Sequence, residues 1–370
     1  MWTKEDSSSE VVERAWSLQV EGSHNYSLVK KCQKVRDEFI VWNRTCFGII
    51  KNIIKEIEDK IKMLQDMAPT KENLELEASL NIELNDWMER EELKWKQKSR
   101  ELWLKEGDRN SKFFHLSTLI RRRRNLIAEI QLDNGHWIHD RKDIEDYFAN
   151  HFKEVFLSSS PTFPQDLEGL MEPCISIAEN LSLSQIPNAK EIKDVVWEMN
   201  DMKAPGPDGL PRIFFKKYWQ IVGLQVIIAI QSFFRKDWLL KQLNHTFITL
   251  IPKRHGARNF NQFRPINLCN FYYKVISKIL VNRLRPLLAK IIDPAQLAFV
   301  PNQWIAENVV LAQEVVHSFR KTKKKNGYMG FKLDFHKAYD RLEWNFIIIV
   351  LRTLGLIKQS LISFTSVFPQ

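Results

Sequence analysis

The sequence predicts an α+β protein that is strongly helical and falls into two parts. Residues 26–124 are charged, nearly free of proline and glycine, and apolar at helical spacing. Short β-prone runs at residues 246–251 and 328–333 come only later. A Ser- and Pro-rich stretch at residues 157–164 reads as a linker. We therefore expect a basic, mainly helical part over residues 1–160 and a mixed part over residues 161–370.

The first part is expected to contain two long antiparallel helices. Apolar side chains line one face of the first helix at three- or four-residue steps: Phe39, Trp42, Cys46, Ile50, Ile53, Ile57, Ile61 and Leu64. Pro69 ends that helix, and a second begins at Lys71 and is interrupted at Gly107. The apolar face predicts packing between the two helices.

A β-hairpin and another helix complete this part. Asp133-Asn134-Gly135 is a strong turn signal between the apolar runs 126–132 and 136–138. A helix is expected over residues 140–156, with Asp140 as its N-cap.

The second part alternates helices with isolated strands. Helical patterns cover residues 188–199, 211–219, 221–238, 271–288 and 304–320, and strands are expected at 246–251 and 328–333. Prolines and glycines at residues 203–209 (KAPGPDG) form a rigid loop between helices.

Composition favours a polyanionic partner and excludes several classes of protein. The net charge of the 370 residues is +10, which suits nucleic acid, although a basic surface without such a partner is an equal alternative. The four cysteines are scattered without a CxxC pair, which argues against a zinc module and a disulfide framework. No signal peptide or membrane-spanning run is present. We expect a soluble protein of the nucleus or cytoplasm, with no membrane partner.

The most informative chemistry lies at Asp334. This carboxylate follows the β-prone run 328–333, and an acid at the tip of a buried strand is well placed to hold a divalent cation. Asp340 follows six residues later, where capping of the next helix would explain it without any metal. The pattern alone leaves both readings open.

Five sequence blocks in order carry a resemblance to a known family. They lie within residues 203–344 and read APGPDGLP, ITLIPK, FRPINLCNFYYKVISKILVNRL, QLAFVP and KLDFHKAYDRLEW. Together they resemble the reverse transcriptase of non-LTR (LINE-type) retrotransposons, especially those of plants. WLKEGDRNSKFFH at residues 103–115, and the RRRRN that follows, resemble the segment that joins endonuclease and reverse transcriptase in such elements. The resemblance implies the fingers and part of the palm of a right-hand polymerase fold.

The resemblance also implies roles for individual residues. Asp334 matches the first metal-binding aspartate of the palm, where Mg²⁺ is the family's cofactor. Tyr339 matches the aromatic residue under the sugar of the incoming nucleotide, although a buried core tyrosine is the alternative. Lys253 and Arg264 match residues that neutralise the triphosphate, although either could be an ordinary surface charge. The implied partners are an RNA template, a DNA primer and deoxynucleoside triphosphates.

Basic side chains concentrate in a run of four arginines, Arg121, Arg122, Arg123 and Arg124, near several aromatic residues. Such a cluster fits contact with a nucleic-acid backbone, and a solvated helix face is the alternative. The Lys-rich run at residues 321–325 has the same two readings.

The family's later [FY]-A-D-D motif, whose aspartates complete the metal site, is absent, and residues 346–370 contain no Asp or Glu. We therefore expect a truncated polymerase with weak or absent Mg²⁺ binding and no catalysis by the chain alone. A non-catalytic nucleic-acid-binding remnant and a chain without a stable fold are the alternatives.

Overall fold

The computed structural model describes residue 2 and residues 5–99, 111–164, 166–201, 203–296, 298–321, 328–335 and 337–366. The chain forms two compact units that interleave along the sequence. Unit 1 comprises residues 1–144, 192–232 and 240–274, and unit 2 comprises residues 145–191, 233–239 and 275–370. The expected domain boundary near residue 160 falls within unit 2. The division of the chain at that residue stays a prediction.

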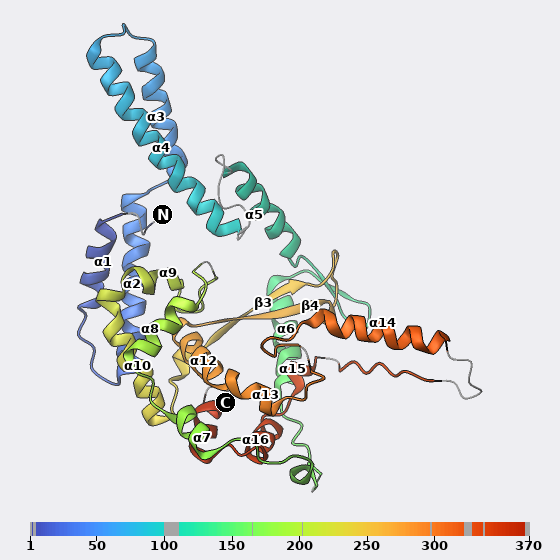
Figure 1. Cartoon of the computed structure of the whole chain (residues 1–370). Coiled ribbons are helices and arrows are strands. Elements are labelled where there is room, and N and C mark those ends of the chain that lie inside the picture. The colour runs from blue at the N-terminus through green and yellow to red at the C-terminus, as the bar shows by residue number, and fades with distance from the viewer. Residues whose placement is uncertain are drawn as a thin grey trace. The chain divides into compact units, whose positions relative to one another are not determined.

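Unit 1 begins with five helices (Figure 1): α1 (Ser7–Trp16), α2 (His24–Cys46), α3 (Ile50–Gln65), α4 (Lys71–Ser99) and α5 (Ser111–Asn125). The prediction of one continuous helix across residues 39–64 is wrong, because α2 ends at Cys46. Gly48 adopts a φ of +49°, a left-handed conformation that a helix does not accommodate. The interruption expected at Gly107 lies outside the described residues.

The helices α3 and α4 run side by side as a helical hairpin (Figure 1). Ile54, Ile57 and Ile61 of α3 recur at helical spacing and are buried. Pro69 lies in the turn between the two helices, as expected. The antiparallel packing predicted from the apolar stripe is thus confirmed for α3 and α4.

The small β-hairpin is also confirmed. Strand β1 (Ile130–Gln131) pairs antiparallel with β2 (Trp137–Ile138) across the predicted turn, in which Gly135 has a φ of +85°. The next helix, α6 (Arg141–Phe156), is capped by Asp140, whose carboxylate accepts hydrogen bonds from the N–H groups of Lys142 and Asp143 at 2.7 and 3.3 Å.

The elements from residue 189 to residue 269 follow the predicted order along the chain. They are α8 (Ala189–Glu198), α9 (Arg212–Lys217), α10 (Trp219–Lys236), α11 (Lys241–Asn244), β3 (Thr246–Pro252) and β4 (Phe263–Cys269), with a 3₁₀ turn at Phe260–Gln262. Strand β4 was not predicted. The helices α6, α8, α10 and α12 (Phe271–Leu284) contribute residues to both units.

Aromatic side chains form much of the core of unit 1. Phe39 of α2 lies 6.1 Å from the ring of Phe214 in α9 and 5.7 Å from Trp42. Full burial of one such side chain stabilises the fold by about 1.5–3 kcal/mol. Tyr272 is also buried, and its hydroxyl donates to the Ala229 carbonyl at 2.7 Å. The helical first part therefore packs directly against the elements that lead into β3 and β4.

Unit 2 is helical in its described residues (Figure 1). Besides parts of α6, α8, α10 and α12 it contains α7 (Ile177–Ser184), α13 (Leu288–Ile291), α14 (Ile305–Lys321), α15 (Ala338–Arg341), α16 (Trp344–Thr353), α17 (Lys358–Thr365) and two 3₁₀ turns (Leu167–Leu170 and Arg285–Leu287). An apolar cluster holds it together: Ile175, Leu183, Leu287, Leu356 and Leu361. The buried Asn180 side chain donates to the Gly355 carbonyl and accepts from the N–H of Ile357, at 2.8 and 2.9 Å.

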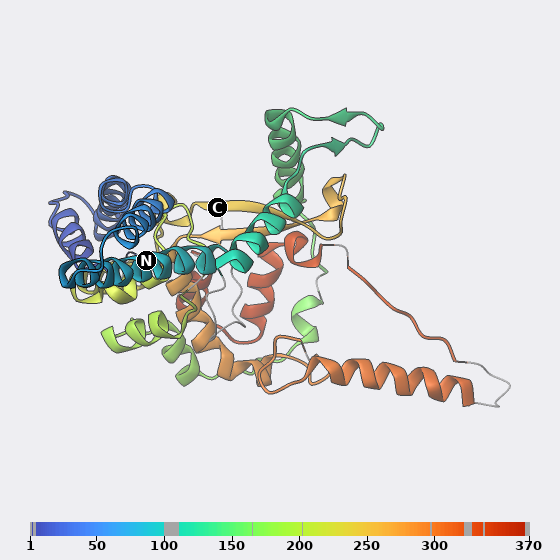
Figure 2. The ribbon, with the colours of Figure 1, turned by 90° about the horizontal axis from the view of Figure 1, so that it is seen from above.

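The expected strand before Asp334 is absent from the structure. Residues 328–335 form an extended trace without a strand partner among the described residues (Figure 2). Phe331 and Leu333 are each 82% exposed, so the expectation of a buried strand is wrong. Apolar alternation specifies a strand only when another strand completes its hydrogen bonds and covers one face.

No helix within the described part of the chain is long and apolar enough to cross a membrane.

Candidate nucleotide and nucleic-acid interface

A two-stranded hairpin carries the residues predicted to meet a triphosphate. β3 and β4 pair antiparallel from Thr246 opposite Cys269 to Pro252 opposite Phe263. The sequence missed β4 because Pro265, in its middle, argues against a central strand. Among the described residues the sheet has two strands, so each strand has a free edge at which a proline is tolerated.

Lys253 and Arg264 lie at the same end of this hairpin. Arg264 stands opposite Ile251, and the Lys253 N–H continues the ladder by donating to the Gln262 carbonyl at 2.8 Å. Because side chains alternate along a strand, Lys253 and Arg264 belong to the same face. Both residues are exposed. The Lys253 Nζ donates to the Asn261 carbonyl at 2.8 Å, so this lysine also closes the turn.

The small hairpin β1–β2 supports the turn between β3 and β4. The Gln131 N–H donates to the Arg258 carbonyl at 2.8 Å, and the Arg258 guanidinium lies 5.3 Å from the centroid of the Trp137 ring. Arg254 and Arg258 are exposed. The turn is therefore a basic surface held by a second hairpin, and sequence reasoning missed Arg258 because its partner, Trp137, is remote in the sequence.

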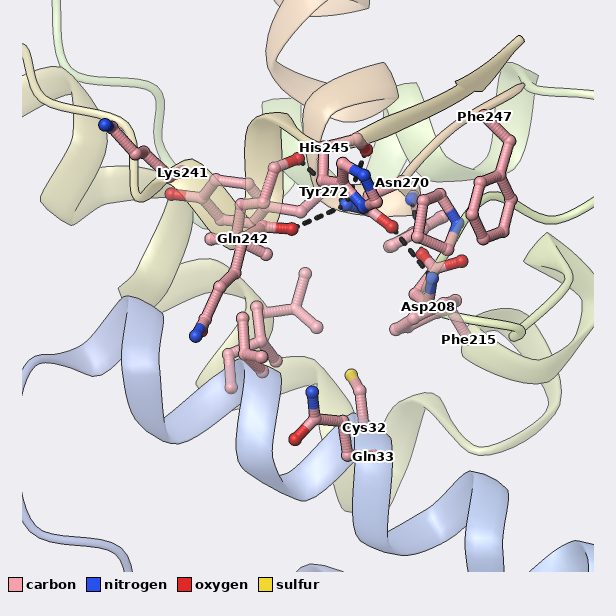
Figure 3. A pocket seen from close by; sticks show the side chains of 16 residues that line it. Cys32, Gln33, Asp208, Phe215, Lys241, Gln242, His245, Phe247, Asn270 and Tyr272 are labelled. Carbon is pink, nitrogen blue, oxygen red and sulfur yellow. Dashed lines mark hydrogen bonds between the residues drawn. The ribbon is translucent and has the colours of Figure 1, made fainter. Parts of the chain in front are cut away.

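The opposite end of the hairpin is held by Asp208 and Asn270. The Asn270 side chain accepts a hydrogen bond from the Asp208 N–H at 2.8 Å, and its amide nitrogen lies 3.0–3.2 Å from the carbonyls of Gln242, Leu243 and His245. The Asp208 carboxylate accepts from the Phe271 N–H at 2.6 Å. These bonds join the loop at residues 206–209 to both the start of β3 and the end of β4 (Figure 3).

The loop approaches the hairpin so closely that only glycine fits at position 206. A Cβ at Gly206 would lie 2.3 Å from the Cys269 carbonyl oxygen, inside any possible contact distance. Gly209 has a φ of +72°, which glycine adopts without steric penalty. The KAPGPDG segment, predicted as a rigid loop between helices, thus also docks on β4.

Burial dominates the electrostatics at this end of the hairpin. It raises the pKa of the Asp208 carboxyl, and hydrogen bonds led by the one from Phe271 oppose that shift. Burial and then the charge of Asp208 raise the pKa of the Cys32 thiol. Burial lowers the pKa of Lys274, and the charge of Asp208 opposes this. Cys32 is consequently a poor nucleophile.

The four predicted nucleic-acid-binding arginines divide into two kinds. The Arg121 guanidinium donates to the carbonyls of Lys98 and Ser99 at the end of α4, so Arg121 has a structural role. Arg122, Arg123 and Arg124 are exposed and form no side-chain hydrogen bond or ion pair within the described part of the chain. Their helix, α5, contacts β3.

Asp334 and Tyr339 are both exposed, and Tyr339 is 82% exposed. This contradicts the alternative of a buried core tyrosine. The Tyr339 ring makes an edge contact with Phe299, with centroids 6.2 Å apart. Asp340 does not cap α15, because Lys337 occupies the N-cap position with a φ of +53°. Asp340 lies in the first turn, where a carboxylate interacts favourably with the helix dipole.

The described residues do not provide a complete metal site. No three His, Cys, Asp or Glu side chains come together among them in a metal-binding arrangement. Asp334 is an oxygen ligand of the kind Mg²⁺ prefers, but octahedral Mg²⁺ needs further partners. Asp334 therefore fits one position of a magnesium site and no more.

The predicted site residues are distributed over both units. Lys253, Arg264 and the arginine run at residues 121–124 belong to unit 1, whereas Asp334 and Tyr339 belong to unit 2. Within unit 1, Lys253 and Arg264 share one face of the β3–β4 hairpin, and α5 contacts β3. Within unit 2, Asp334 and Tyr339 share one exposed segment.

Comparison with known proteins agrees with the resemblance read from the sequence. Residues 251–368 match the family model described as reverse transcriptase (RNA-dependent DNA polymerase). This range includes β3 from Ile251 onward, all of β4, and the segment with Asp334 and Tyr339.

Two curated relatives extend the similarity. The chain is similar to the transposon TX1 uncharacterized 149 kDa protein of Xenopus laevis, with 28% identity over 257 residues that cover 69% of this chain and 19% of that protein. It is also similar to the retrovirus-related Pol polyprotein from type-1 retrotransposable element R2 of Nasonia vitripennis, with 29% identity over 166 residues that cover 44% and 15%. The chain thus spans about a fifth or less of the length of these relatives. Residues 251–368 are thus similar to a reverse transcriptase domain, and the two relatives are proteins of transposon and retrotransposable elements.

Proposed function

We propose that this chain provides the fingers and the first part of the palm of an RNA-directed DNA polymerase of a LINE-type retrotransposon. The observation that carries this proposal is the reverse transcriptase match over residues 251–368, which includes the end of β3, all of β4 and Asp334. The order of the five sequence blocks supports the LINE-type, plant-like assignment.

In this proposal the exposed hairpin face binds the incoming deoxynucleoside triphosphate. Lys253 and Arg264 belong to one face at one end of the hairpin, so both charges can contact the same phosphate chain. The planar guanidinium of Arg264 can grip two phosphate oxygens at once, whereas Lys253 acts as a point charge. Hydrogen bonds from the Asp208 N–H to Asn270 and from the Phe271 N–H to Asp208 join the other end of the hairpin to the loop at residues 206–209.

Asp334 and Tyr339 take the roles of metal-binding aspartate and sugar-contacting aromatic. Their exposure leaves both side chains accessible to a nucleotide. Mg²⁺ supplies charge stabilisation to phosphoryl transfer when its site is complete. Because this chain contributes one carboxylate of the family's set, we propose that the 370 residues alone do not catalyse primer extension.

A primer-extension assay tests this proposal. The purified chain, an RNA template, an annealed DNA primer and Mg²⁺ should yield no extended product. Extension that disappears with Asp334→Ala would overturn the proposed inactivity and would at the same time establish the role of Asp334. Extension that survives this substitution would refute the assignment of Asp334.

Nucleotide binding can be tested without catalysis. Titration calorimetry with dTTP at low salt should show weaker binding by at least about fivefold for Arg264→Ala, because loss of one charged contact removes about 1 kcal/mol or more. Arg44→Ala, an exposed arginine on α2, is the matched control and should leave the affinity unchanged. Equal affinities for the two variants would contradict the role of Arg264.

Nucleic-acid binding without catalysis is the second candidate function. It is favoured by the three exposed arginines of α5, Arg122, Arg123 and Arg124, on a helix that contacts the hairpin strand β3. A filter-binding assay with single-stranded RNA should show salt-dependent binding that the triple alanine variant weakens. Absence of binding at low salt would rule out this function.

A further inference from the structure

Residues 158–163, here called the strap, lie against the start of α16 within unit 2. The hydroxyls of Ser158 and Ser159 donate to the Glu343 carboxylate at 2.7 and 3.1 Å. The Ser159 N–H donates to the same carboxylate at 2.9 Å. One carboxylate therefore receives three hydrogen bonds from two neighbouring serines that precede it by about 185 residues.

The strap holds the first turn of α16 through Glu343 and Phe346. The hydrogen bonds, led by the one from Ser158, lower the pKa of the Glu343 carboxyl, so this group is charged at neutral pH. Glu343 is the N-cap residue of α16, and its carbonyl accepts the Ile347 N–H at 3.2 Å. The Phe163 ring lies 6.1 Å from the Phe346 ring in the same turn.

Ser160 lies in the middle of the strap and is exposed. Its N–H donates to the Ser158 hydroxyl at 3.1 Å, whereas its own hydroxyl forms no hydrogen bond among the described residues. Pro161 follows it directly, and no other serine or threonine of the 370 residues directly precedes a proline. Proline has a fixed φ and no N–H, and one class of protein kinases selects its serine by the proline that follows.

We propose that Ser160 is a phosphorylation site for a proline-directed protein kinase, and that its phosphate releases Glu343 from the strap. The kinase transfers the γ-phosphoryl group of ATP. The bond between the γ-phosphorus and the β–γ bridging oxygen breaks, and a bond from that phosphorus to the Ser160 Oγ forms. The hydroxyl proton passes to the catalytic carboxylate of the kinase, and ADP leaves. The proposal does not depend on polymerase activity.

A phosphate on Ser160 acts on Glu343 in two ways. It adds a charge of about −1.5 to −2 at pH 7 directly beside Ser159, so it repels the Glu343 carboxylate. Its oxygens are also strong acceptors that compete for the hydroxyls of Ser158 and Ser159. With the hydrogen bonds to Glu343 weakened, the first turn of α16 opens more often.

Kinase treatment tests the site. The full chain, ATP, Mg²⁺ and a purified mitogen-activated protein kinase should yield a product with one added phosphoryl group, measured by intact mass spectrometry. Ser160→Ala and Pro161→Ala should each abolish the addition, because they remove the acceptor hydroxyl and the proline that directs the kinase. Ser159→Ala and Pro164→Ala are the matched controls and should accept phosphate as wild type does. Absence of phosphate from wild type, or its retention by Ser160→Ala, would refute the site.

Hydrogen–deuterium exchange tests the release of Glu343. The amides of residues 347–350 in α16 should exchange about fivefold faster in the phosphorylated chain, the change expected when one hydrogen bond is lost. The amides of residues 28–39 in α2 are the internal control and should exchange at an unchanged rate. Unchanged exchange at residues 347–350 would overturn the proposed release.

A variant of Glu343 tests the repulsion. Glu343→Gln keeps an acceptor oxygen for the serine donors but carries no charge. Phosphorylation of Ser160 should therefore accelerate the exchange of residues 347–350 less in this variant than in wild type. Equal acceleration in the two proteins would contradict repulsion between the phosphate and Glu343.

Discussion

Asn270 accepts a hydrogen bond from the backbone N–H of Asp208 at 2.8 Å, across 62 residues of sequence. Asp208 in turn accepts from the N–H of Phe271, the neighbour of Asn270, at 2.6 Å. This reciprocal pair fixes the loop at residues 206–209 against the start of α12. Because β4 ends at Cys269, the same pair also sets the position of the hairpin that carries Arg264.

Removing the Asn270 side chain should destabilise unit 1. Asn270→Ala leaves the Asp208 N–H and the carbonyls near the Asn270 amide without these partners, so the free energy of unfolding should fall by about 2–3 kcal/mol. Urea denaturation measures this. Asn267→Ala, at an exposed position of β4, should change the free energy of unfolding by no more than about 0.5 kcal/mol. Similar losses of unfolding free energy for the two variants would contradict this role of Asn270.

The stability of the protein should depend on pH through Asp208. Burial raises the pKa of its carboxyl, so the folded protein binds this proton more tightly than the unfolded chain does. The resulting stabilisation is fully present below the unfolded pKa of about 3.9 and is lost as the pH rises through the folded pKa. Wild type should therefore gain stability relative to Asp208→Asn as the pH falls from about 7 to about 4. Urea denaturation at several pH values checks this, and a constant difference would refute it.

A methyl group at position 206 should disrupt the docking of the loop. Gly206→Ala places Cβ 2.3 Å from the Cys269 carbonyl oxygen, so backbone must move and the free energy of unfolding should fall by about 2 kcal/mol or more. Gly169→Ala is the control, because nothing lies within 4 Å of its added Cβ. Thermal denaturation compares the two, and a neutral Gly206→Ala would show that the approach is looser than described.

Arg121 should behave differently from the three arginines that follow it. Arg121→Ala should lower the free energy of unfolding by about 1 kcal/mol, because it removes donors from the carbonyls of Lys98 and Ser99. It should leave the salt dependence of RNA binding unchanged. Alanine at residues 122–124 should instead reduce the slope of log K against log salt by about 2 and leave stability unchanged. Equal effects of the two variants on RNA binding would contradict this division.

Sequence patterns correctly predicted the elements that are stabilised by interactions between residues close in the sequence. The Asp133-Asn134-Gly135 turn and the Asp140 cap act within a few residues, and both are present in the structure. The prediction of one helix through residue 48 was wrong because Gly48 adopts a left-handed conformation that the apolar spacing does not reveal. The prediction of a strand at residues 328–333 was wrong because a strand forms only when it pairs with another strand, which can be remote in sequence.

By itself the sequence determined the helical first part, the reverse transcriptase resemblance and the candidates Lys253, Arg264, Asp334 and Tyr339. It did so because helix periodicity, turn chemistry and motif order are all properties of neighbouring residues. The tertiary structure alone decided that Arg121 caps α4 and that Asn270 holds the end of the β3–β4 hairpin. Those facts depend on contacts between segments far apart in the chain, where packing and desolvation set the free energy of each group.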